Sequence, residues 1–175
     1  MIVVFYLTAL ITVGSTIMVI TRSNAVHALL YLVVSFLSAS FLFFLFGAPF
    51  VAALEVIIYA GAIMVLFVFV IMMLNIGKTA AKIERSVFEA KAWIGPAVLV
   101  LIIAAELMYV VLGSGMKVVS VTNVSPQKVA INLYGPYLIG VELAALLLLS
   151  GMVGAYHLGR RKRTVVHRFL RENER

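Results

Sequence analysis

Five long apolar runs divide this chain, and each is long enough to cross a bilayer as a helix. We predict spans at about 2–20, 26–46, 51–75, 93–112 and 134–158. Because 64% of the residues are hydrophobic and only 12% are charged, the chain has too little polar surface to cover a soluble core. The sequence therefore predicts an all-α, polytopic membrane protein with five transmembrane helices.

The connections between the predicted spans are short. The longest, about 76–92 and 113–133, cannot hold a soluble domain. We therefore predict a membrane domain over 1–160 and a basic tail over 161–175, with no nucleotide-binding or catalytic globular unit. The chain has no Cys, which excludes iron–sulfur ligation, and its three His residues lie far apart, so we predict no metal or haem site.

Positive charge is distributed unevenly between the two ends of the spans. Of the Lys and Arg residues, one lies in the turn at 21–25, four in the 76–92 loop and seven from residue 160 onward, whereas the other side has only Lys117 and Lys128. The positive-inside rule then predicts an outside N-terminus and a cytoplasmic C-terminus. The basic cluster after residue 159 is interpreted as an anchor at anionic lipid headgroups, so we predict contact with the lipid bilayer and none with nucleic acid.

Three carboxylates, Glu55, Glu106 and Glu142, lie inside predicted spans. An ionisable group in a span costs about 2.5–3.5 kcal/mol on insertion scales, which favours a functional role or a dedicated partner. Counted from the predicted outer ends at ~1.5 Å per residue, all three fall in one layer of the outer half of the membrane. The alternative stays open that each pairs with a Lys, Arg or hydroxyl of another subunit, or is partly hydrated near the headgroups.

The third predicted span has a second feature directly after Glu55. Tyr59 follows one helical turn later, and Ala60, Gly61 and Ala62 come next. Glycine inside a helix costs roughly 0.5–1 kcal/mol relative to alanine, and in a span it permits close helix packing or a local change of register such as a π-bulge. From the spacing alone, both a packing role and a hinge role remain possible.

Several segments, read together, resemble a known family. They are Asn24–Tyr31, Ala53–Val70, Gly135–Tyr137 and Val141–Leu143. In order and spacing they are similar to subunit J of the bacterial proton-pumping NADH:quinone oxidoreductase, respiratory complex I, whose mitochondrial counterpart is NADH dehydrogenase subunit 6. The resemblance runs from the first span to about residue 160. Two positions depart from it, because Ala25 stands where the family often has Pro and Glu106 matches no family motif.

The resemblance implies a function that composition does not. It implies a membrane-arm subunit of the bacterial inner membrane that helps couple NADH:quinone electron transfer to proton translocation, with other membrane-arm subunits as partners. It implies no catalytic residue, no redox centre and no bound cofactor in this chain, with flavin, iron–sulfur clusters, NADH and quinone in partner subunits, so the isolated chain is not expected to be catalytic. Glu55, Tyr59 and Glu142 are the implied proton-pathway candidates, and Tyr59, Ala60 and Gly61 the implied helix hinge.

A different class of protein is the main alternative. In a small subunit of a multisubunit cation/proton antiporter, Glu55 and Glu142 would be ion ligands and the assembly would have no redox partner. A purely structural scaffold is a third possibility. Glu106 remains a buried carboxylate of uncertain role under all three.

Overall fold

The computed structural model describes residues 2–73, 90–113 and 124–160. Every regular element in these ranges is helical: α1 (Ile2–Thr21), α2 (Ala25–Leu45), α3 (Pro49–Leu54), η1 (Glu55–Ile63), α4 (Met64–Met73), α6 (Ala90–Gly113), α7 (Pro126–Tyr134) and α8 (Leu138–Gly159). Five helical stretches of this described part are long and apolar enough to cross a membrane. The all-α class and the five spans are thus confirmed, while the predicted tail at 161–175 lies outside the described residues.

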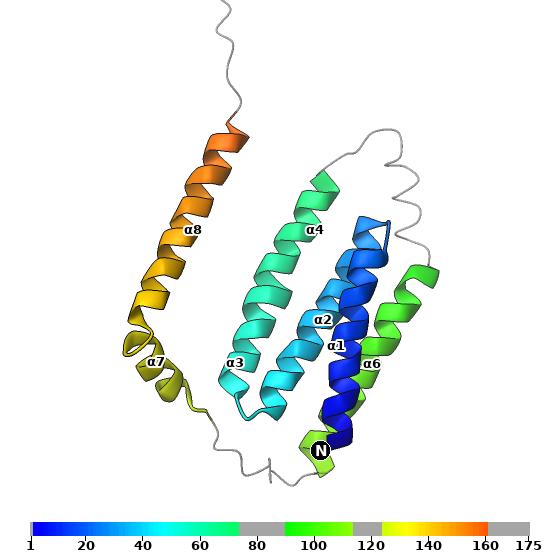
Figure 1. Cartoon of the computed structure of the whole chain (residues 1–175). Helices are drawn as coiled ribbons and strands as arrows, with labels where there is room; N and C mark the ends of the chain where they lie inside the picture. Colours follow the sequence, from blue (N-terminus) through cyan, green and yellow to red (C-terminus); the bar gives the residue numbers. More distant parts are fainter. Residues whose placement is uncertain (1, 74–89, 114–123, 161–175) are drawn as a thin grey trace, which may run out of the picture. The chain divides into compact units, whose positions relative to one another are not determined.

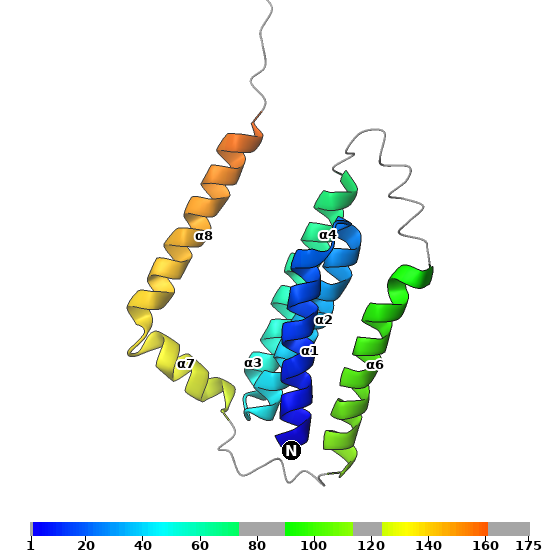
Figure 2. The ribbon, with the colours of Figure 1, turned by 45° about the vertical axis from the view of Figure 1, so that its right-hand side comes forward.

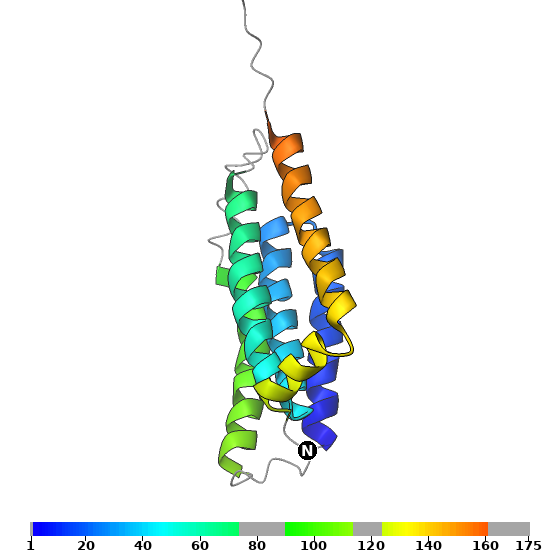
Figure 3. The ribbon, with the colours of Figure 1, turned by 90° about the vertical axis from the view of Figure 1, so that its left-hand side faces the viewer.

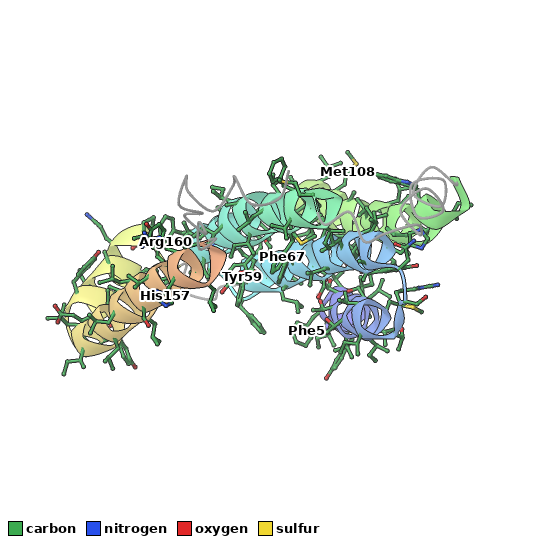
Figure 4. The ribbon with its side chains drawn as sticks, turned by 90° about the horizontal axis from the view of Figure 1, so that it is seen from above. Phe5, Tyr59, Phe67, Met108, His157 and Arg160 are labelled. Carbon is green, nitrogen blue, oxygen red and sulfur yellow. The ribbon has the colours of Figure 1, made fainter. Side chains whose placement is uncertain are left out.

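The first compact unit, Met1–Pro126, contains the first four spans. Figures 1 and 2 show these helices running side by side. The second helix, α2, is the central one, since it contacts α1, the third span and α6. Seen from above, α1 lies on one side of α2, and the third span and α6 lie on the other (Figure 4).

Two short turns connect α1 to α2 and α2 to α3, and both have a local cause. The side chain of Asn24 accepts a hydrogen bond from the backbone N–H of Val26 and caps the start of α2, so the helix begins at Ala25 without a proline there. Gly47 adopts a positive φ of 78°, a conformation open to glycine, and Pro49 then begins α3. Each of the two turns therefore reverses the direction of the chain within a few residues.

The apolar core of this unit is formed by α1, α2 and α6. Its buried members are Val4, Ile11, Val34, Phe41, Ile103 and Val110. The third span contributes little to it, because Ala52 and Met64 are its buried residues within the described part and most other side chains are partly or largely exposed. Figure 3 shows α3, η1 and α4 as one continuous helical rod beside α2. This rod thus presents an apolar surface outward.

The second unit, Gln127–Arg175, differs from the sequence prediction. The fifth span begins at Leu138, not at 134, and a separate short helix, α7, occupies part of the predicted 113–133 connection. A Cβ atom at Gly135 would lie 2.7 Å from the carbonyl oxygen of Ile131, and Pro136 has no N–H to continue the helical hydrogen bonds. These two residues therefore separate α7 from α8, and in α8 the described residues include no buried side chain.

Candidate functional site

The third span changes its helical form at Glu55. The residues from Glu55 to Ile63 form a π-helix between two α-helical segments. At its end, the backbone N–H of Met64 donates to the carbonyl oxygen of Tyr59, five residues earlier, where an α-helix would join residues four apart. π-helical turns are rare and occur frequently at functional sites. The segment predicted as a hinge, Tyr59 to Gly61, lies inside this π-helix.

Gly61 lies where this π-helix leaves little room for a side chain. A Cβ atom at this position would lie 3.3 Å from the carbonyl oxygen of Val56, tighter than an ordinary contact. At Gly14, Gly140 and Gly151, all in ordinary α-helices, a Cβ atom would meet nothing within 4 Å beyond the adjacent turns of its own helix. Val56 lies five residues before Gly61, the spacing that a π-helical hydrogen bond joins, so the close approach at position 61 involves the π-helix itself.

Tyr59 and Glu55 lie on the same helix, and neither is fully buried. The Tyr59 ring packs against the ring of Phe36 on α2, with centroids 5.3 Å apart and planes at 54°, and 45% of the residue stays exposed. Glu55 is half-buried. The described side chains include no hydrogen bond between Glu55 and Tyr59. In the view of Figure 4, Tyr59 is labelled on the third span. Both polar groups are thus open to further contacts.

Glu106 has a very different environment from Glu55. It lies on α6 and is only 7% exposed, and its Oε2 lies 2.8 Å from the fully buried hydroxyl oxygen of Thr8 on α1, within hydrogen-bond distance. Its second oxygen, Oε1, is buried and has no hydrogen-bond partner. The sequence left open a hydroxyl from another subunit as the partner of this carboxyl. The structure instead supplies a hydroxyl from the same chain, 98 residues away.

A row of hydroxyl groups joins α1 to α2 in the two helical turns of α1 that follow Thr8. The hydroxyls of Thr12 and Ser38 lie 2.9 Å apart, and those of Thr16 and Ser35 lie 2.8 Å apart. This row was not predicted, although the sequence contains a signal for it. Thr8, Thr12 and Thr16 recur every four residues, which places their side chains on one face of the first span.

Glu142, the third proton-pathway candidate, lies on α8 in the second unit, and its side chain is exposed. It is the fifth residue of that helix, closer to its start than predicted, because the helix begins at Leu138. The described residues show no hydrogen bond or ion pair at Glu142, and they contain no cluster of three His, Cys, Asp or Glu side chains that could hold a metal ion. The structure thus places Glu55 and Tyr59 on one helix and Glu142 in a separate unit.

Comparison with known proteins decides the family. Residues 15–158 match the family described as NADH-ubiquinone/plastoquinone oxidoreductase chain 6. The chain belongs to this family. It is 50% identical over 159 residues to NADH-quinone oxidoreductase subunit J of Escherichia coli (strain K12), which covers 91% of this chain and 86% of the relative. It is 52% identical over 160 residues to the subunit J of Pseudomonas aeruginosa, covering 89% and 95% of the two chains.

More distant relatives extend the similarity over the same length. The subunit J of Buchnera aphidicola subsp. Baizongia pistaciae is 38% identical over 161 residues, which cover 91% of this chain and 98% of the relative. The chain is thus a complex I chain 6 family member with five apolar helices, consistent with a multi-pass membrane protein of an electron-transport complex. The family match includes the π-helix, Glu106 and Glu142, whereas Thr8 precedes its first residue.

Proposed function

We propose that this chain is a membrane-arm subunit of respiratory complex I that helps couple NADH:quinone electron transfer to proton translocation. Family membership supports the assembly, and the π-helix from Glu55 to Ile63 is the observation that carries the coupling role. A π-helical hydrogen bond spans one more residue than an α-helical hydrogen bond, so a change between the two forms rotates the residues on one side relative to those on the other. The third span is thereby suited to switching.

Glu55, Tyr59 and Glu142 supply the proton-carrying chemistry in this proposal. A carboxyl group can accept and release a proton, and a phenolic hydroxyl can donate and accept a hydrogen bond. Glu55 is the first residue of the π-helix and Tyr59 lies at its middle. A shift of this segment into α-helical form would therefore turn both groups and change their contacts with neighbouring subunits.

Redox chemistry belongs to partner subunits in this proposal. Flavin, iron–sulfur clusters, NADH and quinone bind there, and this chain has no catalytic residue of its own. Large apolar side chains stay exposed along α4 and α8, among them Phe67, Phe69 and Leu147. Such surfaces suit neighbouring membrane helices and lipid. The proposed location is the bacterial inner membrane, with the N-terminus outside and the C-terminus in the cytoplasm.

Affinity capture tests the assembly. A tagged copy of the chain, purified in mild detergent, is expected to bring with it flavin, iron–sulfur clusters and NADH-oxidising activity. The matched control is the untagged strain. The antiporter alternative, which rests on the same carboxylates Glu55 and Glu142, requires none of these partners. Capture of other membrane proteins without flavin, iron–sulfur clusters or NADH-oxidising activity would contradict the complex I proposal and favour the antiporter.

A further inference from the structure

The contact between α6 and α1 contains a carboxyl group that the proposed function does not use. Glu106 is 7% exposed and Thr8 is fully buried, so the two side chains meet inside the helix bundle. The carboxyl oxygen Oε2 lies 2.8 Å from Thr8 Oγ1, and Oε1 has no partner. The described residues place no Lys, Arg or His side chain in an ion pair with this carboxyl group.

The hydrogen count at Thr8 indicates which group carries the shared proton. Thr8 Oγ1 lies 2.8 Å from the carbonyl oxygen of Val4 and also 2.8 Å from Glu106 Oε2. A hydroxyl has one proton to donate and can accept others. If Thr8 donates to Val4, the short contact with Glu106 is a hydrogen bond only when the carboxyl group is the donor.

The cost of burial favours that arrangement. An ionised carboxylate here would be buried with a single neutral donor and no positive partner, and an unpaired buried charge is far more costly than an unpaired dipole. A neutral acid leaves only its carbonyl oxygen, Oε1, without a donor. A buried carbonyl oxygen without a donor costs less free energy than a buried carboxylate without a positive partner, because the neutral group carries no full charge.

We propose that Glu106 is a proton-binding site of this chain, a neutral acid whose Oε2–H donates to Thr8 Oγ1 and links α6 to α1. The proton stays in place during turnover. Thr8 donates its own proton to the Val4 carbonyl in a hydrogen bond, and the link from Thr8 to Thr12 runs through the backbone carbonyl oxygen of Thr8, 2.8 Å from Thr12 Oγ1. Backbone carbonyl oxygens have no proton to pass on, so the hydroxyl row of Thr12 and Ser38 does not continue to Glu106 as a chain of exchangeable protons.

Infrared spectroscopy of the purified, assembled complex tests the protonation state. The difference between wild type and Glu106→Gln is expected to contain the carbonyl stretch of a protonated carboxyl group. Thr8→Val removes the acceptor of the Oε2 proton and should shift this band, whereas Thr8→Ser, which keeps a hydroxyl, should leave it close to its wild-type position. Carboxylate bands in place of the protonated band, or a band that Thr8→Val leaves unmoved, would overturn the proposal.

Function and assembly of Glu106→Gln provide a second readout. An amide reproduces a neutral acid, because its NH₂ donates where Oε2–H did and its oxygen replaces Oε1. The variant should therefore assemble and translocate protons within about twofold of wild type. Loss of assembly would indicate that the position needs an ionised carboxylate, and loss of pumping in an assembled complex would indicate that the Glu106 proton moves during turnover. Either result would contradict the proposal. The infrared result does not depend on coupling, so its failure and that of the proposed function are distinguishable.

Discussion

Two carboxyl groups of the same unit have opposite environments. Glu106 is covered by the helix bundle and joined to Thr8, whereas Glu55 is half-buried and lies on the outward-facing third span. A group that is to exchange protons needs access to a donor and an acceptor outside its own helix. The geometry therefore separates a proton that stays, at Glu106, from a candidate carrier, at Glu55.

Substitution of Glu55 tests the carrier role. Glu55→Gln keeps the size of the side chain but cannot release a proton, so proton translocation should slow by about two orders of magnitude, the lower end of what acid–base groups contribute. NADH oxidation by an artificial acceptor should stay near wild type, because the redox centres are in other subunits. The measurement is proton uptake per NADH oxidised in reconstituted vesicles, with Glu106→Gln as matched control. Equal pumping rate and stoichiometry in an assembled Glu55→Gln complex would reduce Glu55 to a structural residue.

At the scale of elements, α1 and α2 form the closest helix pair. Their contact contains the hydrogen bonds between Thr12 and Ser38 and between Thr16 and Ser35. Hydrogen bonds between membrane helices average only about 0.6 kcal/mol, so these bonds orient the pair more than they stabilise it. The third span is joined to α2 by one such bond, from the Ser40 hydroxyl to the carbonyl oxygen of Ala52, which lies in α3 before the π-helix begins. Among the described residues, no side-chain hydrogen bond ties the π-helix itself to α2, so its contact with α2 is by packing, which a change of register can repack.

Gly61 is the position at which this register change is tested. In α-helical form an added methyl group gains roughly 0.5–1 kcal/mol relative to glycine, whereas in the π form it would press on the Val56 carbonyl at 3.3 Å. Gly61→Ala should thus shift the segment toward α-helix by at least a factor of about 2–5, and Gly61→Val, with a restricted χ1, should be more severe.

The decisive measurement for Gly61 is proton translocation per assembled complex in vesicles. If the helix switches during turnover, both variants should assemble yet show lower quinone-linked activity and pumping, with artificial-acceptor NADH oxidation retained. Gly14→Ala is the matched control, because a Cβ atom there meets nothing within 4 Å. Reduced assembly with normal coupling in the surviving complexes would instead support a packing role.

At the scale of the whole molecule, the described part of each unit leaves many large apolar side chains exposed. Exposed large hydrophobic side chains occur on α1, α4, α6 and α8, and in the described part of α8 no side chain is buried. A soluble protein could not tolerate such surfaces, but a bilayer or adjoining membrane helices cover them without cost. These surfaces suit a multi-pass membrane protein, and they are consistent with the proposed packing against helices of partner subunits.

Topology is the prediction that belongs to this scale. Five spans place the two termini on opposite sides of the membrane, and the Lys and Arg asymmetry predicts an outside N-terminus. Reporter fusions at the C-terminus and within 76–92 should be active only in the cytoplasm, and fusions within 113–133 only outside. A C-terminal reporter that works solely on the outer face, or evidence for an even number of spans, would overturn the predicted orientation.

Sequence alone was enough for the number of spans and for the third span as the segment of interest. About 20 consecutive apolar residues have no stable place except a membrane or a buried core, so hydropathy predicts spans without knowledge of their packing. The third span also stands out in the linear sequence, because it places a carboxylate, a tyrosine and a glycine at short spacing, at Glu55, Tyr59 and Gly61. The helix boundary at Leu138 was less accessible, because it depends on the backbone turn at Gly135, where the carbonyl oxygen of Ile131 leaves no room for a Cβ atom.

The partner of Glu106 could not be read from the chain. Helices that are apolar around most of their circumference carry no periodic signal that says which face meets which neighbour. Thr8 and Glu106 are 98 residues apart, and only the docking of α6 onto α1 brings their oxygens within 2.8 Å. Local chemistry therefore determines which segments enter the membrane, whereas the state of a buried carboxyl group depends on contacts that exist only after the helices have packed.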